Sequence, residues 1–333
     1  MIDRVLAECQ VGLPGWRGLG TDAFDFAPPK GFSTFTMAVR AKRPLSPPAV
    51  LYRRLAGKDN AILDVGAERV VFLALAEAGI APRCLHYEPG FRLEAFYEGA
   101  TLVAEDLYDP ATLRGVAEQL YRFHHMAPPP LPAASFFELL HARWAPLARH
   151  VLVDRRDAFP ANERVLCEPL TALFSEATRR KVAAFLPEGP LHFCHNDSYH
   201  GNVMRLADGG IRLLDFEFSC LNHRAFDFAN LFAETVMVHG LTEPPHFRIA
   251  APRFTDAELE ILIGAYLDHG SFPSASAQEQ ELQTLVQQTR RALPLSDYMY
   301  AMAALPLALE PVQRIRFLPY AHQRFERFLA ARP

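Results

Sequence analysis

The sequence predicts an α+β protein with two unequal lobes, a small β-rich lobe followed by a larger and mainly helical one. Alternating apolar and polar residues, typical of strands, concentrate before residue 99. Helical periodicity dominates after a proline-rich segment at 128–132, and a length of 333 residues corresponds to about two domains. We therefore expect an N-terminal extension over 1–30, a first lobe over 31–99 and a second lobe over 100–333.

Four predicted strands and one helix make up the first lobe. The strand segments alternate in polarity and are rich in β-branched and aromatic residues. They are 32–40, 49–55, 83–88 and 91–98. Between the second and the third of them, apolar residues at helical spacing predict a helix over 61–78, which Gly79 follows as a C-terminal signal.

The second lobe is predicted to consist of helices around a short β interval. The helical segments are 110–125, 135–150, 168–185 and a series from residue 223 to the end, with a Gln-rich helix at 277–293. The β interval consists of 191–195, 202–206 and 211–216. The last two segments are linked by Ala-Asp-Gly-Gly, a hairpin turn signal. A β lobe with one helix, followed by a helical lobe that holds a small β interval, is the plan of the protein-kinase-like fold.

Composition and charge argue against several broad classes of protein. Hydrophobic residues make up 50% and charged residues 22% of the chain, as in ordinary globular proteins. The net charge of −4 argues against a protein whose main partner is a nucleic-acid backbone. The five cysteines lie far apart and form no CxxC pair, so we expect reduced thiols rather than disulfides or a cysteine zinc site. Without a signal peptide or a long apolar run, we expect a soluble cytoplasmic protein.

The strongest functional signal begins at the end of the predicted strand 191–195. Residues 195–202 read H-x-D-x-x-x-x-N, and Asp215 follows thirteen residues later on the second strand of the hairpin. A carboxylate beside an acceptor hydroxyl can orient it and accept its proton. An amide oxygen and a second carboxylate can hold Mg²⁺ against nucleotide phosphates. Because one short hairpin would bring Asp197, Asn202 and Asp215 together, the pattern predicts phosphoryl transfer that uses ATP and Mg²⁺.

Each of these residues also has an ordinary structural interpretation. Asp197 and Asn202 could cap a turn, and Asp215 could end a strand. All three in this order and spacing, between β and helical segments, favour the catalytic interpretation, because they resemble the catalytic and metal loops of the kinase template. His124 and His125 offer metal ligands as well, but no third ligand lies within sequence reach.

The stretch that follows the loop carries a more specific resemblance. Residues 213–218 read L-L-D-F-E-F, and residues 222–234 read N-H-R-A-F-D-F-A-N-L-F-A-E. Together with the H-N-D…G-N loop, this resembles the choline/ethanolamine kinase family, which carries an L-[IL]-D-F-E-[YF] strand and an N-[YH]-R-x-F-D-x-[AG]-N-x-F-x-E helix entry. Protein kinases read D-F-G at this place, and aminoglycoside phosphotransferases usually read I-D-W or V-D-F. The resemblance covers residues 30–330 and is tightest over 192–234.

The resemblance implies roles for residues of the second lobe. It implies that Asp197 is the catalytic base, which also contacts the substrate, and that Asn202 and Asp215 are the catalytic metal ligands. Asp227 would brace the catalytic loop, and His195 would support it structurally. Acids and aromatic rings suit a substrate ammonium group. The further substrate residues expected on this basis are Glu217, Glu234, Tyr300 and Tyr320.

The resemblance also implies a phosphate-binding arginine in the first lobe. Arg54, at the end of the second predicted strand, matches the family's R-[LI]-[YP]-G, and a guanidinium fork binds phosphate well. Glu68 of the predicted helix would be its partner, as the helix Glu is for the lysine of protein kinases. Ser33 and Thr34 would contact phosphate through their hydroxyl and backbone N–H groups.

The adenine ring is expected at the fourth predicted strand. Residues 92–98 resemble the family's R-[LI]-E-x-[FY] hinge. Adenine would hydrogen-bond to the backbone between Glu94 and Tyr97, with Ala95 and Tyr97 as the contacting residues, and apolar side chains would sandwich the ring.

The resemblance points first to choline or ethanolamine as the acceptor. Family choline sites use tryptophans on a late helix, whereas this chain has only Trp16 and Trp144. The acceptor could therefore be another alcohol, such as an aminoglycoside, thiamine, a sugar or a natural product. A nucleotide-binding pseudokinase is the alternative from another class. It predicts the loss of a base or metal residue, but all three residues of the motif are present.

Overall fold

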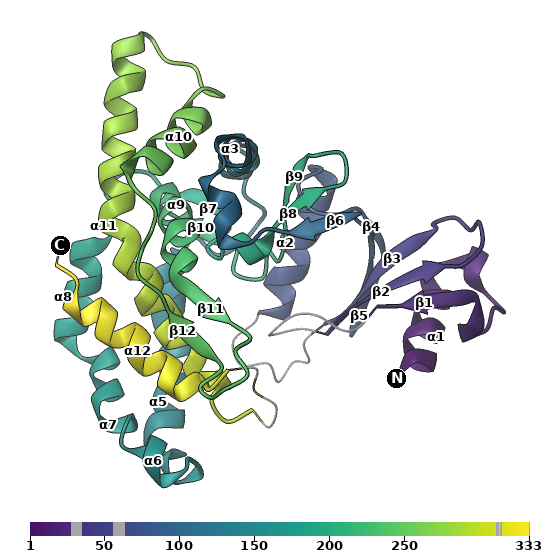
Figure 1. Cartoon of the computed structure of the whole chain (residues 1–333), viewed down its shortest axis with the longest axis horizontal. Helices are drawn as coiled ribbons and strands as arrows, with labels where there is room; N and C mark the ends of the chain where they lie inside the picture. The colour runs from purple at the N-terminus through teal and green to yellow at the C-terminus, as the bar shows by residue number, and fades with distance from the viewer. Residues whose placement is uncertain (28–34, 56–63, 311–312, 314, 333) are drawn as a thin grey trace. The chain divides into compact units, whose positions relative to one another are not determined.

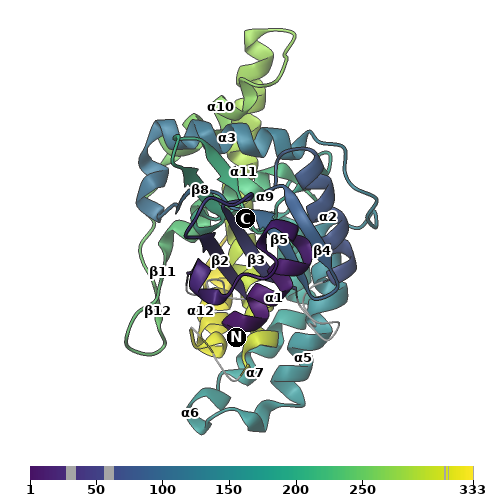
Figure 2. The same cartoon turned by 90° about the vertical axis from the view of Figure 1, so that its right-hand side faces the viewer.

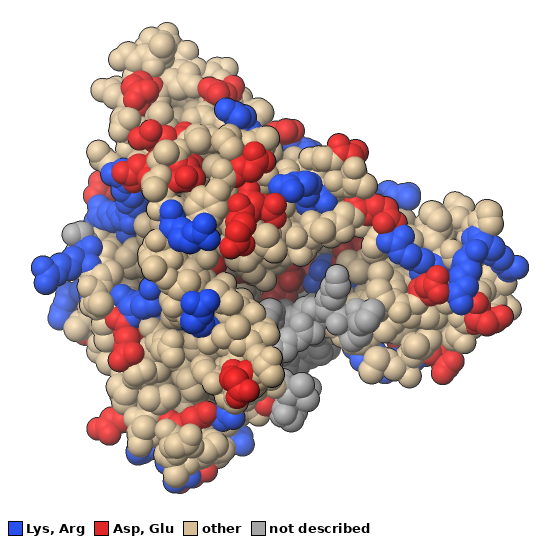
Figure 3. Space-filling view, viewed as in Figure 1, with Lys and Arg blue, Asp and Glu red and all other residues tan. Residues whose placement is uncertain are grey.

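The computed structural model describes residues 1–27, 35–55, 64–310, 313 and 315–332. The chain divides into two compact units, Met1–Gly99 and Ala100–Pro333 (Figure 1). Within the described ranges, no helix is long and apolar enough to cross a bilayer. Figure 3 shows basic and acidic side chains interspersed over one face of the molecule, in keeping with a net charge near zero. None of the five cysteines forms a disulfide.

A five-stranded antiparallel sheet forms the centre of the first unit, with the strand order β1-β2-β3-β5-β4. The strands are β1 (Phe24–Phe26), β2 (Thr36–Ala41), β3 (Ala49–Arg54), β4 (Cys84–Glu88) and β5 (Phe91–Ala95). The helices are α1 (Ile2–Gly12) and α2 (Val65–Glu77). Strands β2 to β5 and α2 match the predicted elements, and Gly79 adopts a φ of 65°, the left-handed conformation that commonly follows a helix.

Alternation along β3 and β5 gives this sheet two chemically different faces. Strand pairing places Tyr52 opposite Leu93 and Arg53 opposite Arg92. Because successive side chains point to opposite sides of a strand, these two pairs lie on opposite faces. Tyr52 and Leu93 belong to an apolar core that includes residues of α1. On the other face, the Arg92 guanidinium lies 3.6 Å from the centroid of the Phe72 ring of α2.

Most of the segment that we set apart as an N-terminal extension folds as part of the first unit. The apolar side of α1 is buried, and β1 pairs with β2. Two short 3₁₀ turns, Pro14–Trp16 and Thr21–Ala23, connect them. Trp16 is fully buried, and its indole N–H donates to the carbonyl oxygen of Pro47 at 3.1 Å. The segment therefore covers the apolar face of the sheet.

Helices make up most of the second unit. The α-helices are α3 (Pro110–His124), α4 (Phe136–Leu139), α5 (Ala145–Val153), α6 (Ala161–Arg164), α7 (Cys167–Leu170), α8 (Glu176–Phe185), α9 (Arg224–Ala233), α10 (Asp256–Leu267), α11 (Ala275–Leu307) and α12 (Phe317–Ala330). α9 is buried along nearly its whole length and packs against α11, which also packs against α12. α10 lies beside α3 in both views (Figure 1 and Figure 2). The predicted helix at 135–150 is α4, a π-helical turn and α5.

Short strands form three small sheets in the second unit, with the orders β6-β8-β9, β10-β7 and β11-β12. The strands are β6 (Gly99–Thr101), β7 (His192–Cys194), β8 (Val203–Leu206), β9 (Ile211–Leu213), β10 (Cys220–Asn222), β11 (Met237–His239) and β12 (Phe247–Ile249). β7, β8 and β9 match the predicted β interval. Val203 lies opposite Leu213, so the predicted hairpin is confirmed. As a result, Asn202 before β8 and Asp215 after β9 lie at the same end of the hairpin.

Candidate active site

The loop that follows β7 is shaped by one asparagine. Asn196 adopts a φ of 64°, a left-handed conformation that asparagine tolerates better than most residues. Its side-chain nitrogen donates to the carbonyl oxygens of Cys194 at 3.3 Å and Phe218 at 3.0 Å. These bonds hold the turn that presents Asp197 directly after the strand.

A buried carboxylate from α9, Asp227, binds the same loop. One of its oxygens accepts the backbone N–H of His195 at 2.8 Å, and the other accepts the N–H of Asn196 at 2.7 Å. Burial alone would raise the pKa of Asp227, but the hydrogen bonds from His124 and the His195 backbone hold it below its usual value. The ionised carboxylate therefore holds two consecutive backbone N–H groups directly before Asp197, as a brace of the loop would.

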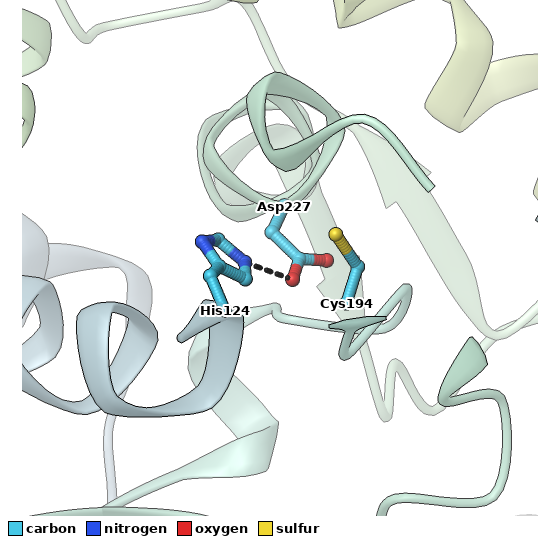
Figure 4. Close-up of side chains that lie close together, drawn as sticks. All are labelled: His124, Cys194 and Asp227. Atoms are coloured by element: carbon cyan, nitrogen blue, oxygen red, sulfur yellow. Dashed lines mark hydrogen bonds and ion pairs between the residues drawn. The ribbon is translucent and has the colours of Figure 1, made fainter. Parts of the chain in front are cut away.

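His124 of α3 points its ring at the Asp227 carboxylate (Figure 4) and also contacts Tyr266 of α10. Its Nε2 lies 2.9 Å from Asp227 Oδ2, and its Nδ1 lies 3.2 Å from the Tyr266 hydroxyl. Burial lowers the pKa of His124, so the ring is neutral: Nε2–H donates to Asp227, and Nδ1 accepts from Tyr266. His124, Cys194 and Asp227 are close enough together to resemble a metal site. However, Cys194 Sγ donates to the Asn222 carbonyl oxygen at 3.4 Å, so every ligand atom has a protein partner and we interpret the cluster as a hydrogen-bonded brace.

Replacing His124 with phenylalanine is expected to lower the free energy of unfolding by about 2–3 kcal/mol, because two buried polar groups would each lose a partner. Chemical denaturation measures this difference. His125→Phe is the matched control, since this neighbouring side chain is exposed and should change the free energy by less than about 0.5 kcal/mol. Equal stability of the His124→Phe variant and the wild-type chain would contradict the brace.

The polar residues of the predicted motif meet at one end of the β8–β9 hairpin. The Asn202 side-chain nitrogen donates to Asp197 Oδ2 at 2.8 Å and to the Asp197 carbonyl oxygen at 2.9 Å. Leu214, the residue before Asp215, donates its N–H to the Asn202 carbonyl oxygen at 2.8 Å. His195 Nε2 lies 2.8 Å from the Leu214 carbonyl oxygen and ties the loop to the hairpin.

Asp197 is a buried carboxylate with acidic neighbours. Burial raises its pKa well above the usual value, and the charges of Asp215 and Glu234 raise it further, whereas hydrogen bonds from Tyr300 and Asn202 lower it. A carboxylate with a raised pKa is a stronger base than an ordinary one. The local chemistry therefore suits proton transfer from a hydroxyl group.

Asn202 and Asp215 offer oxygen atoms that suit Mg²⁺. Because the Asn202 amide nitrogen is bound to Asp197, its amide oxygen is the atom left to act as a ligand. Asp215 adopts a φ of 62°, a strained conformation that is typical of functional positions. Carboxylate and amide oxygens are ligands that Mg²⁺ accepts. The residues present fit the metal, which would supply positive charge to nucleotide phosphates.

The predicted substrate residues Glu234, Tyr300 and Tyr320 surround an arginine that the sequence motifs do not include. Arg324 of α12 donates to both Glu234 oxygens, at 2.5 and 2.7 Å. Its guanidinium carbon lies 5.0 Å from the ring centroids of both Tyr300 and Tyr320. Asp297 of α11 also accepts from Arg324, at 2.8 Å. An internal cation thus occupies the aromatic and acidic surroundings that we expected for a substrate ammonium.

Replacing Arg324 with methionine is expected to lower the free energy of unfolding by about 3–5 kcal/mol, because Glu234 would stay buried without its cation. Arg327→Met is the matched control on the same helix. Arg327 pairs with Asp297 at 3.1 Å, but its side chain is 36% exposed, so its loss should cost less than about 1 kcal/mol. Calorimetric unfolding compares the two variants. An equal loss of unfolding free energy in both would show that the buried Arg324–Glu234 pair stabilises the chain no more than the exposed pair does.

In the first unit, the carboxylate of Glu68 accepts a hydrogen bond from Arg92. Arg92 also donates to Glu94 at 2.7 Å, and Arg53 donates to Glu94 at 3.2 Å. Glu94 is buried, and although burial would raise its pKa, the charges of Arg92 and Arg53 hold it below its usual value. Two arginines and two carboxylates therefore form one network beside α2.

Arg54 lies on the other face of the sheet from this network. It pairs across β3 and β5 with Phe91, and its guanidinium lies 4.8 Å from the centroid of the Phe35 ring. Glu68 therefore pairs with Arg92, and the pairing with Arg54 that we expected is wrong. Because strand side chains alternate, the arginine of β3 that shares a face with Glu68 is Arg53.

Other predicted site residues lie at the ends of strands or outside the described ranges. Ser33 and Thr34 are outside the described residues. Ala95 is the last residue of β5. Its backbone N–H donates to the carbonyl oxygen of Arg83, just before β4, at 2.9 Å, so this N–H takes part in the pairing of β5 with the β4 side of the sheet. Tyr97 and Glu217 are half-buried.

The sequence profile of the choline/ethanolamine kinase family matches residues 30–329. The chain belongs to the choline/ethanolamine kinase family. It is therefore a phosphotransferase that acts on an alcohol hydroxyl, and its acceptor is a small molecule. This membership confirms the resemblance found in the sequence.

Relatives and solved structures agree with this assignment. A human choline/ethanolamine kinase is 28% identical over 283 residues, which cover 82% of this chain and 68% of that protein. A choline kinase from Cryptosporidium parvum gives a TM-score of 0.77 at 20% identity, over 99% of this chain and 94% of that one. An ethanolamine kinase from Plasmodium vivax gives 0.71 at 20% identity, over 93% and 82%. At these identities the structures show the fold, which is protein-kinase-like as the sequence predicted.

Proposed function

We propose that this family member transfers the γ-phosphoryl group of ATP to the hydroxyl of choline or ethanolamine and requires Mg²⁺. The observation that carries the proposal is the arrangement of Asp197, Asn202 and Asp215 at one end of the hairpin. Asp227 fixes the loop that presents the first two of them. We place the reaction in the cytoplasm, where ATP is available and where five unpaired thiols stay reduced.

Each residue of this arrangement has one role in the proposed reaction. Asp197 orients the acceptor hydroxyl and accepts its proton as the oxygen forms a bond to the γ-phosphorus. The bond between the γ-phosphorus and the bridging oxygen breaks, and ADP leaves with that electron pair. Asn202 and Asp215 would hold Mg²⁺, whose charge offsets that of the phosphates.

On the nucleotide side, we assign phosphate binding to Arg53 rather than to Arg54. Arg53 lies on the same face of the sheet as Arg92, which binds Glu68 of α2. The contact of Arg53 with Glu94 fixes its guanidinium. A fixed guanidinium binds phosphate at a small entropic cost. From the family resemblance we also propose that adenine binds the backbone between Glu94 and Tyr97 and that phosphate binds at Ser33 and Thr34.

The acceptor assignment rests on the family and on the acids and rings near Asp197. A second candidate is an alcohol without an ammonium group. The observation that favours it is Arg324, whose guanidinium already binds Glu234 and lies close to the rings of Tyr300 and Tyr320. A second cation would gain less from a group that is already neutralised.

A panel of acceptors with ADP release as the readout tests the proposal. The panel contains choline, ethanolamine, an aminoglycoside, thiamine and 3,3-dimethylbutanol, the uncharged isostere of choline. We expect choline or ethanolamine to give the highest kcat/KM. Turnover of 3,3-dimethylbutanol equal to that of choline would favour the second candidate, and turnover of only a non-amino alcohol would overturn the first.

A further inference from the structure

A chain of hydrogen bonds leads from α9 and α11 to the carboxylate of Asp197. The hydroxyl of Tyr300 on α11 donates to Asp197 Oδ1. The side-chain nitrogen of Asn230 on α9 donates to the same hydroxyl at 3.4 Å. The hydroxyl of Ser296, one helical turn before Tyr300, donates to Asn230 Oδ1 at 2.8 Å. These three side chains come from elements far from the catalytic loop in the sequence.

The direction of each bond follows from chemistry. An ionised Asp197 only accepts, so the Tyr300 hydroxyl must donate to it. The Tyr300 oxygen is then free to accept, which requires the nitrogen of Asn230 to face it. Asn230 Oδ1 therefore faces Ser296, whose hydroxyl donates. One proton arrangement satisfies all three contacts, so Asn230 fixes the direction in which Tyr300 donates.

Tyr300 and Asn202 together hold both oxygens of the catalytic carboxylate. Asn202 binds Asp197 Oδ2 at 2.8 Å from the hairpin, and Tyr300 binds Oδ1 from α11. Each carboxylate oxygen has a second lone pair, so an acceptor hydroxyl can still donate to Asp197 while Tyr300 stays bound. Tyr300 is partly exposed, unlike Ser296 and Asn230, which are buried. The arrangement fixes the plane of the carboxylate without blocking it.

We infer that Tyr300, directed by Asn230, is a positioning residue that sets the orientation of Asp197 for phosphoryl transfer. Our sequence-based expectation for Tyr300 was a contact with the substrate ammonium, and this role is a different one. The inference rests on the proposed role of Asp197 as the base, but not on which alcohol is the acceptor. Positioning of this kind affects the chemical step, because a reacting group displaced by about 1 Å can cost on the order of 10²-fold in rate.

The test compares Tyr300→Phe with Tyr298→Phe on the same helix. Tyr298 is fully buried, and its hydroxyl lies 2.7 Å from His141 Nε2, so its variant loses a tyrosine hydroxyl contact that does not involve Asp197. We expect Tyr300→Phe to lower kcat about 10-fold to 100-fold with the KM for ATP unchanged within about twofold. Tyr298→Phe should keep kcat within about threefold of wild type. Equal kcat in Tyr300→Phe and wild type would overturn the inference.

A double-mutant cycle with Asn230→Ala separates positioning from stability and leaves Tyr300 in place in one arm. In the wild-type background, Asn230→Ala should lower kcat about fivefold, and in the Tyr300→Phe background it should have no further effect. If the losses of kcat multiply in the double variant, Asn230 does not act through Tyr300, and the inference that Asn230 directs Tyr300 is wrong. Failure of the proposed function would appear instead as absent choline and ethanolamine turnover by the wild-type chain, and any alcohol that it does turn over serves for the comparison.

Discussion

Asp197→Asn is expected to lower kcat about 10³-fold or more while the chain stays folded, because an amide cannot accept the proton of the acceptor hydroxyl. Burial raises the pKa of Asp197, so the ionised carboxylate lowers the stability of the folded chain. Removing that charge should leave the free energy of unfolding unchanged or higher, which is typical of residues that serve activity at the expense of stability. Steady-state ADP release and thermal unfolding of the same preparation measure both effects.

Asp208→Asn is the control for this variant. Asp208 lies in the exposed turn of the β8–β9 hairpin, where its side chain accepts the N–H of Gly210 at 2.9 Å. It carries the same charge at the end of the hairpin away from Asp197, and its replacement should leave kcat within about twofold. Full activity of Asp197→Asn would show that Asp197 is not the base. A large loss in Asp208→Asn would show that the assay reports hairpin stability instead.

Asp215→Asn is expected to lower kcat about 10²-fold to 10³-fold and to raise the Mg²⁺ concentration needed for half-maximal rate, because the metal would lose an anionic ligand. Titration of Mg²⁺ at saturating ATP checks this for the variant and the wild type. A partial recovery of rate at high Mg²⁺ would agree with a ligand role. A lower kcat with an unchanged Mg²⁺ dependence would contradict that role and point to an effect of the strained backbone at this position.

The loop after β7 and the β8–β9 hairpin could be predicted from the sequence because local spacing and turn residues define them. The spacing from His195 to Asn202 and the turn before Asp215 define a strand, a loop and a hairpin. A hairpin brings its two outer ends together whatever the rest of the fold is. For that reason the sequence alone predicts that Asp197, Asn202 and Asp215 lie together, whatever helices surround them.

The surroundings of Asp197 could not be predicted in the same way, because they depend on helix packing. Tyr300 is on α11 and Arg324 is on α12. The residues next to them in the sequence form no motif that would predict the contact of Tyr300 with Asp197 or of Arg324 with Glu234. One signal was available for Arg324. It follows Tyr320 by four positions and precedes Phe328 by four, so it lies on the apolar side of α12, where a charged residue indicates a buried ion pair.

The choice between Arg53 and Arg54 shows a limit of motif matching. The family's R-[LI]-[YP]-G can be aligned with Arg54, but the register of β3 against β5 decides which arginine shares a face with Glu68. A shift of one residue along a strand moves a side chain to the other face of the sheet. The motif alone does not contain this register, whereas the strand pairing does.

Transfer of labelled phosphate from ATP to an amino alcohol is the decisive measurement for the proposed reaction. The chain is incubated with ATP labelled at the γ-phosphate, Mg²⁺ and either choline or ethanolamine, and the label is followed into the phosphate ester by mass spectrometry. We predict that the label appears in the ester of at least one of the two alcohols, and that it disappears when Mg²⁺ is chelated or Asp197→Asn replaces the wild type. Label found only in inorganic phosphate, or in the ester at equal rates with Asp197→Asn, would contradict the proposed function.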